Sequence, residues 1–189
     1  MSILSRFQTQ SKHFAVAVVF LGGFTDLCVY SIIIPIIPFV LEEIHEPESW
    51  IGILLAIYGL GVIVGSFTLG LMVSRKLVSK KLGMIGSLFV VWASILFFAL
   101  GHNIWMLCIA RFFQGLASCG VWVLGLALVA DLYGGEEDKI GTVMGIIFSG
   151  LSMGMLLGPP ISGWLFTYGR QWPYVFCAGL VGLDLVGGC

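Results

Sequence analysis

GLSMGMLLGPPISG, residues 150–163, is the stretch that decides the fold class of this chain. Glycine recurs at every fourth position, at Gly150, Gly154 and Gly158, and a pair of prolines beginning at Pro159 follows within the same apolar segment. In a bilayer, glycines at this spacing leave a groove without side chains, into which a neighbouring helix backbone packs closely. Prolines remove hydrogen bonds from the helix, and in lipid the neighbouring helices must satisfy the carbonyls that are freed. The stretch therefore predicts a closely packed transmembrane helix.

The composition is that of a protein embedded in lipid. Of the 189 residues, 59% are hydrophobic and only 10% are charged, and the mean hydropathy is +1.06. Soluble domains are about 25% charged. The formal net charge of -1 gives no indication of nucleic-acid binding. We therefore expect an integral membrane protein whose surroundings are a lipid bilayer.

Residues that could carry catalysis or hold a metal ion are sparse. The five cysteines lie in apolar stretches without a Cys-x-x-Cys pair, so we interpret them as small core residues rather than as disulfides or metal ligands. No phosphate-binding loop and no nucleophile with an adjacent base is found in the sequence. We therefore expect no cofactor, no metal site and no enzymatic activity.

Six apolar segments are long enough to cross the hydrocarbon core, which takes about 20 residues. They follow a polar segment of residues 1–13 and cover residues 14–41, 51–73, 82–100, 105–130, 140–168 and 173–189. The first segment is too long for a signal peptide and lacks a small-residue cleavage site. The chain is therefore predicted to be an all-α membrane domain of six transmembrane helices.

The basic residues are distributed unequally between the two sides of these segments. The predicted cytosolic side carries Arg6, Lys12, Arg75, Lys76, Lys80, Lys81 and Lys139, whereas the other side carries Arg170. The positive-inside rule then places the N-terminus in the cytosol, and the acidic loop of residues 42–49 outside it.

Three ionisable residues fall within the predicted spans. A charge at the bilayer centre costs about 2.5 to 3.5 kcal/mol even on the lenient insertion scale, so Asp26, Arg111 and Asp184 are candidates for substrate binding and proton coupling. Gln114, one helical turn from Arg111, can contribute a neutral hydrogen-bonding group on the same face.

Each of these charges also has a structural interpretation. Asp26 either binds a cation or proton or only hydrogen-bonds to a neighbouring helix. Arg111 keeps its charge at any accessible pH, so it either lines a cavity or ties two helices together. Asp184 either lines a cavity or meets water near the cytosolic end of its helix.

Several motifs resemble those of one transporter family. Residues 111–115, Arg-Phe-Phe-Gln-Gly, resemble the Arg-x-x-Gln-Gly motif in the fourth helix of major facilitator superfamily transporters. Residues 154–163 resemble the fifth-helix antiporter motif Gly-x-x-x-Gly-Pro-x-x-Gly-Gly, with Ser162 in place of one glycine. Asp26, followed by Pro-Ile-Ile-Pro at residues 35–38, is similar to the first helix of the drug:proton antiporters, a branch that includes the vesicular amine transporters.

The resemblance implies the amino-terminal half of a twelve-helix fold, in which two six-helix halves rock around a site at the midplane. Asp26 would then face an amine substrate or a proton, and Arg111 with Gln114 would take part in proton coupling. The run from Gly150 to Gly163 would seal and bend the central cavity. The implied activity is proton-coupled antiport of small organic cations or drug-like amphiphiles, with a second six-helix half as partner.

The loop after the second span departs from the family pattern Gly-x-Leu-Ala-Asp-Arg-x-Gly-Arg-Lys. Gly70 and Arg75 agree with that pattern, but Ser74 replaces the aspartate and Leu77 replaces the second glycine. In the family this carboxylate helps to lock the cytosolic gate. The resemblance therefore implies a gating role for Gly70 and Arg75 without that carboxylate.

The sixth span ends the chain without a basic or polar anchor. We therefore expect either a truncated half of a larger protein or a partner that covers this end. A function of a different class is then open, namely a non-transporting helix bundle that serves as an interaction partner or forms a homodimer through its glycine faces.

The distribution of basic residues makes a testable prediction about topology. A tag inserted between Ser74 and Lys80 should be accessible only from the cytosol, and a tag between Glu42 and Ser49 only from the opposite side, because basic loops are retained in the cytosol. Protease protection in sealed vesicles measures both. The reverse pattern would contradict the predicted orientation.

Overall fold

The computed structural model describes residues 3–75, 79–135 and 137–188, and within these ranges it is all helical with no strand. Seven α-helices and one 3-10 turn follow in order: α1 (Ile3–Ile33), η1 (Ile34–Ile36), α2 (Ile37–Glu43), α3 (Trp50–Ser74), α4 (Lys80–Ala99), α5 (Ile104–Tyr133), α6 (Glu137–Phe166) and α7 (Trp172–Gly188). The predicted fold class, an all-α membrane protein, is confirmed.

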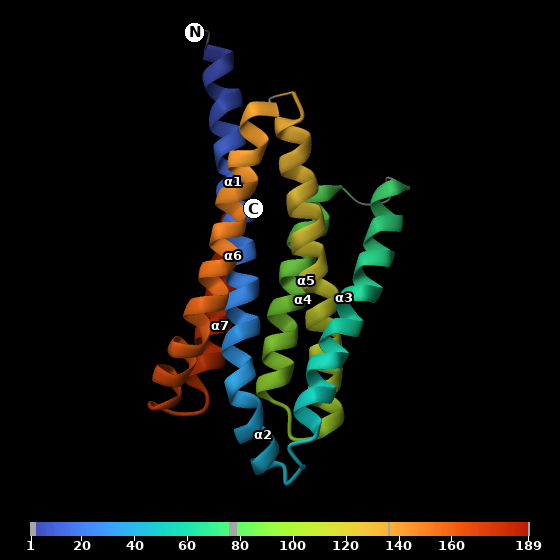
Figure 1. Cartoon of the computed structure of the whole chain (residues 1–189), viewed down its shortest axis with the longest axis vertical. Coiled ribbons are helices and arrows are strands. Elements are labelled where there is room, and N and C mark those ends of the chain that lie inside the picture. The colour runs from blue at the N-terminus through green and yellow to red at the C-terminus, as the bar shows by residue number, and fades with distance from the viewer. Residues whose placement is uncertain (1–2, 76–78, 136, 189) are drawn as a thin grey trace.

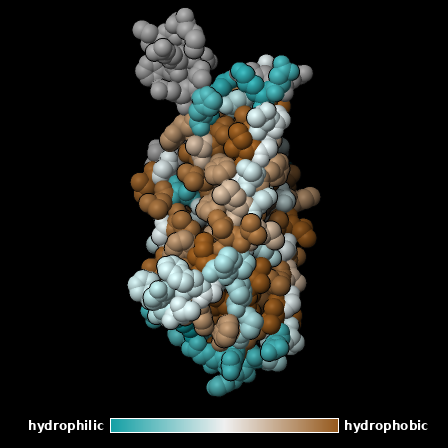
Figure 2. Space-filling view, turned by 60° about the vertical axis from the view of Figure 1, so that its left-hand side comes forward, coloured by the Kyte–Doolittle hydropathy of each residue, from teal (hydrophilic) through white to brown (hydrophobic). Residues whose placement is uncertain are grey.

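The helices run up and down along the long axis of the molecule (Figure 1). Helix α1 packs mainly on α6, and α5 packs on both α3 and α4, while α7 contacts α4 and α1. Five helical segments are long and apolar enough to cross a membrane, and α7 is a shorter apolar helix of 17 residues. Figure 2 shows an apolar band over the middle of one face with hydrophilic residues toward both ends.

Prolines divide the first apolar segment near its C-terminal end. Pro35 lies in the 3-10 turn η1 and Pro38 at the start of α2. A proline lacks the N–H that an α-helix needs, and its fixed φ suits the first turn of a new helical segment. The result is a change of helix type within a single apolar segment.

The glycines of α6 form the contact with α1. A side chain on Gly154 would meet the backbone of Phe24 and Cys28, a side chain on Gly158 would meet Ser31, and one on Gly150 would meet the Phe20 ring. These positions need glycine because the neighbouring helix occupies the space that a Cβ atom would fill. The turn of α1 that rests on Gly154 includes Asp26, so this contact also sets the position of that carboxylate.

Two serines join the same pair of helices by reciprocal hydrogen bonds. Ser31 Oγ on α1 donates to the carbonyl oxygen of Gly154 over 3.1 Å, and Ser162 Oγ on α6 donates to the carbonyl oxygen of Ile32 over 2.8 Å. Interhelical hydrogen bonds of this kind contribute about 0.6 kcal/mol on average in membrane proteins. Ser162 is the residue that departs from the antiporter motif, and its hydroxyl supplies a contact that glycine could not make.

The two prolines of α6 do not end or divide the helix. It runs from Glu137 to Phe166 through Pro159 and Pro160, and both prolines are exposed. Gly163 is also exposed, and open space surrounds the position of its Cβ atom within the described chain. Neither Pro159 nor Gly163 therefore shares the buried glycine contact that Gly150, Gly154 and Gly158 make with α1, and their sealing role stays a prediction.

A second glycine contact joins α3 to α5. A side chain on Gly61 would meet the backbone at Phe112, one on Gly65 would meet the backbone at Leu116, and one on Gly115 would meet the backbone at Tyr58. The two helices thus place glycines on both sides of one interface, which brings their backbones together. This contact places α3 beside the polar face of α5.

The α1–α6 contact predicts a specific effect of substitution. Gly154→Leu should lower the free energy of unfolding in detergent by roughly 1 to 3 kcal/mol or more, because the new side chain overlaps the α1 backbone. Gly145→Leu is the matched control, since open space surrounds Gly145 on the same helix. Leu156→Val, at an exposed position, should have little effect.

Thermal unfolding of the purified variants measures all three. Equal stability of Gly154→Leu and Gly145→Leu would show that the contact between α1 and α6 does not hold the bundle together.

Candidate functional site

Asp26 lies on α1 with only 2% of its surface exposed, and its side chain faces α5. Its Oδ2 atom accepts a short hydrogen bond from Ser118 Oγ and a second from Trp122 Nε1 over 3.0 Å. Its Oδ1 atom is buried without a hydrogen-bond partner. Within the described part of the chain no basic side chain forms an ion pair with this carboxylate. Asp26 therefore has neutral donors on one oxygen and an open acceptor on the other.

A chain of hydroxyl groups leads to this carboxylate from α3. Tyr58 donates its phenolic hydrogen to Ser118 Oγ over 3.0 Å, and Ser118 in turn donates to Asp26. The ring of Tyr58 also contacts the ring of Tyr30 on α1, with 4.6 Å between the ring centroids. Side chains from α1, α3 and α5 thus meet at one polar centre inside the bundle.

Arg111 forms a second polar centre. It is fully buried and lies on α5, the helix that also carries Ser118 and Trp122. Its Nη1 atom donates to Gln114 Oε1 over 3.2 Å, and its guanidinium carbon lies 5.2 Å from the centre of the Phe98 ring on α4. A cation over an aromatic face is attracted by the ring quadrupole. The Nε and Nη2 atoms of Arg111 and the Nε2 atom of Gln114 have no hydrogen-bond partner within the described residues.

The structure does not bring Arg111 and Asp26 into contact. The groups within electrostatic range of the guanidinium are the hydroxyls of Tyr30, Tyr58 and Tyr174. Tyr58 is the residue shared by the two centres, because it also donates to the serine that binds Asp26. Asp26 and Arg111 therefore do not form an ion pair with each other. Their two polar centres are neighbours, and the Tyr58 side chain interacts with both.

Asp184 of α7 faces a different side of α1. It hydrogen-bonds to Thr25, the residue immediately before Asp26, and it is partly buried. Its Oδ2 atom is buried without a hydrogen-bond partner. This placement favours the interpretation of Asp184 as a contact between α1 and α7 over that of a residue that simply meets water.

The sequence analysis missed two polar residues of α5, Ser118 and Trp122. They continue the helix face that begins with Arg111 and Gln114, because the four residues follow one another at intervals of three and four positions. That spacing was the signal that could have identified Ser118 and Trp122. Tyr58 gave no comparable signal, because only the packing of α3 on α5 brings it to the stripe.

The predicted gating residues lie at the C-terminal end of α3, which the sequence predicts to be cytosolic. Gly70 is exposed with open space around it, and Arg75 is exposed. Ser74, which replaces the family aspartate, donates to the carbonyl of Leu71 on its own helix over 2.9 Å. Leu77 lies outside the described residues. The gating roles of Gly70 and Arg75 stay predictions.

The ion pair described at this end joins α4 to α5. Lys80 Nζ lies 2.5 Å from Asp131 Oδ2 and also donates to the carbonyl of Ala127. The pair connects the start of one helix to the end of the other. Within the described residues, these ends of α4 and α5 are thus held to each other and not to Ser74, the last residue of α3.

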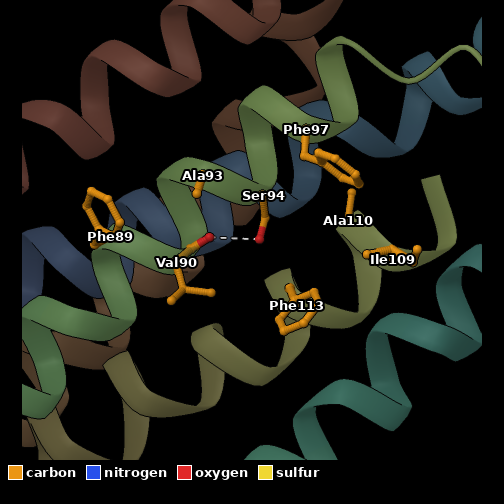
Figure 3. Close-up of a pocket in the computed structure, with 8 residues that line it drawn as sticks. All are labelled: Phe89, Val90, Ala93, Ser94, Phe97, Ile109, Ala110 and Phe113. Carbon is orange, nitrogen blue, oxygen red and sulfur yellow. Dashed lines mark hydrogen bonds between the residues drawn. The ribbon is translucent and has the colours of Figure 1, made fainter. Parts of the chain in front are cut away.

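An apolar pocket of about 300 Å³ between α4 and α5 lies apart from both polar centres (Figure 3). Phe89, Phe97 and Phe113 frame it. Ser94 also lines the pocket, and its hydroxyl group donates a hydrogen bond of 2.7 Å to the carbonyl oxygen of Val90, which the dashed line in Figure 3 marks. The pocket therefore offers no charge to a cationic ligand.

Comparison with known proteins agrees with this architecture. A sequence profile described as the Major Facilitator Superfamily matches residues 19–187. An uncharacterized MFS-type transporter of Schizosaccharomyces pombe is 35% identical over 94% of this chain and 40% of its own length. An MFS-type transporter of Metarhizium rileyi is 32% identical over 91% of this chain and 36% of its own length.

The synaptic vesicular amine transporter of Homo sapiens is 31% identical over 76% of this chain and 27% of its own length. The chain thus spans well under half the length of these relatives. It is an integral, multi-pass membrane protein. The profile and the relatives together establish that this chain belongs to the Major Facilitator Superfamily.

Proposed function

We propose that the intact protein is a secondary active transporter that exchanges protons for small organic cations, with Asp26 as the group that binds both. The observation that carries this proposal is the state of the Asp26 carboxylate. It is buried within an apolar span, and among the described residues it is bonded to neutral donors and keeps one acceptor oxygen without a partner. An intramembrane ionisable residue of this kind is a functional candidate because its burial is costly.

The chemistry of Asp26 suits exchange of two cations. A carboxylate in a low-dielectric interior is stabilised either by taking up a proton or by pairing with a positive charge. Within the described residues no cationic side chain supplies that charge. A proton and an ammonium group would then compete for the same carboxylate, and release of one would accompany binding of the other. This competition is the physical basis of the proposed antiport.

Aromatic side chains around Asp26 fit an organic cation better than a metal ion. Trp122 donates to the carboxylate directly. Tyr58 donates to Ser118, which binds the carboxylate, and the Tyr30 ring packs on the Tyr58 ring. Aromatic faces attract ammonium groups and also bury the apolar part of an amphiphile. The names of the mammalian relatives, synaptic vesicular amine transporters, are consistent with a substrate of this class.

The other polar groups take supporting roles in this proposal. Tyr58 and Ser118 form a hydroxyl chain along which a proton can reach or leave Asp26. Arg111, held by Gln114 on the same face of α5, takes part in proton coupling as the family motif implies. A second six-helix half completes the pathway, because alternating access in this fold occurs between two halves.

Asp26→Asn tests the proposal directly in the intact protein reconstituted into proteoliposomes. Proton-driven uptake of a radiolabelled monoamine and of tetraphenylphosphonium should fall by about tenfold or more, because the asparagine amide neither carries a charge nor exchanges a proton in the way a carboxyl group does. Asp138→Asn is the matched control, because Asp138 is exposed at the cytosolic start of α6.

Thermal unfolding verifies that both variants are folded. Uptake by Asp26→Asn that persists with an unchanged pH dependence would remove Asp26 from the mechanism and leave it as a hydrogen bond between helices.

Tyr58→Phe tests the hydroxyl chain separately from the carboxylate. Proton-driven uptake should slow several-fold, whereas exchange of labelled for unlabelled cation without net proton movement should keep its rate, because Asp26 itself is unchanged. Tyr30→Phe is the matched control, since the Tyr30 ring packs on Tyr58 while the described hydroxyl chain runs through Tyr58. Equal slowing of both reactions would show that Tyr58 shapes the site and does not conduct protons.

A further inference from the structure

A second pocket lies at the predicted outer end of the molecule, where α4 ends and α7 begins, and it encloses a volume of about 640 Å³. Neither Asp26 nor the residues that bond to it line this pocket. Ligand-binding clefts in proteins are typically about 300 to 1,000 Å³. The pocket is therefore large enough for a ligand of its own.

The lining of this pocket changes from polar to apolar along its depth. The polar groups come from the ends of helices and from loops: Glu43 ends α2, His102 follows α4, and Arg170 and Gln171 precede α7. The apolar groups lie further along the two helices and include Leu96 and Ala99 of α4 and Val175 and Ala178 of α7. Residues three apart share one face of a helix, so each helix contributes one apolar wall.

The polar rim carries one charge of each sign. Arg170 and Glu43 form an ion pair across the rim, and both side chains remain partly exposed to the surroundings. His102 and Gln171 add further hydrogen-bonding groups beside them. A ligand of a single charge would satisfy one member of the pair and oppose the other. A zwitterionic ligand can bind its anionic group to Arg170 and its cationic group to Glu43.

The aromatic residues beside the rim are of the kind found in the headgroup region of a bilayer. Trp172 and Tyr168 flank the rim and are exposed, and Trp105 is exposed at the outer end of α5. Tryptophan and tyrosine are enriched at the boundary between hydrocarbon and water. A ligand bound here would place its polar end at the headgroup level and its apolar end beside the lipid chains.

We propose that this pocket binds a zwitterionic glycerophospholipid of the non-cytosolic leaflet. Its phosphate contacts Arg170, its amine contacts Glu43, and one acyl chain lies between the apolar walls of α4 and α7. The apolar pocket between α4 and α5 lacks such a rim and does not share this specificity. The inference depends on the membrane placement of the chain and not on the transported substrate.

Photo-crosslinking to the unmodified protein tests the site without any substitution. The intact protein is reconstituted with phosphatidylethanolamine that carries a photoreactive group on its acyl chain, and labelled peptides are identified by mass spectrometry. We expect the label to concentrate in the peptides that contain residues 96–102 and 170–178. Label spread evenly over the apolar surface, or concentrated on α3 and α6, would overturn the proposal.

Two substitutions then test the two ends of the ligand separately. Arg170→Gln should lower the amount of phosphatidylethanolamine retained in native mass spectrometry by about fivefold, because a charge-assisted contact is lost at a partly exposed position. Ala178→Trp should cause a similar loss by filling the apolar part of the pocket.

Matched controls distinguish the proposed site from general effects on the protein. Lys80→Gln breaks the described ion pair at the opposite end, and Ala93→Trp fills the other pocket between α4 and α5. Both controls should retain phosphatidylethanolamine as the unmodified protein does. Equal loss in the controls and the test variants, or retention of phosphatidylglycerol as strong as that of phosphatidylethanolamine, would contradict the assigned site and its zwitterionic specificity.

Discussion

The polar interior depends on the packing of one turn of α1 against Gly154 of α6. That turn runs from Phe24 to Cys28 and includes Asp26, so the depth and direction of the carboxylate follow from how closely the two backbones approach. In lipid no hydrophobic force drives helices together, and close packing with interhelical hydrogen bonds takes its place. The two serine hydrogen bonds, which lie one turn further along α1 at Ser31 and Ile32, reinforce the same arrangement.

The candidate site forms where α1 and α3 pack against the polar face of α5. With α1 held by α6 and α3 held by its own glycines, the two helices bring Asp26 and Tyr58 to Ser118 from opposite directions. Arg111 lies further along the same face and is stabilised by an amide and an aromatic ring, so its positive charge stays separate from the carboxylate. The described part of the bundle thus holds the carboxyl group of Asp26 and the guanidinium of Arg111 in its interior without pairing them with each other.

The exposed apolar surfaces of the bundle differ in what they offer to other molecules. Helices α3 and α6 leave most of their apolar surface uncovered within this chain, which suits contact with lipid or with further helices. The pocket between the C-terminal end of α4 and the N-terminal end of α7 combines an apolar wall with a charged rim. That combination arises because the end of α2 and the segments between helices carry the polar groups, while the walls from α4 and α7 are apolar as a bilayer requires.

The sequence by itself determined the membrane class, the helical fold, the family resemblance and the close packing of the α6 glycines, because each follows from hydrophobic length or from local spacing. It also singled out Asp26 and Arg111, since charges within apolar spans stand out in any sequence. The tertiary structure alone decided that Asp26 bonds to Ser118 and Trp122, that Arg111 does not pair with it, and that Tyr58 joins the site. Such contacts connect residues far apart in the chain, and they depend on helix rotation and depth, which local spacing does not specify.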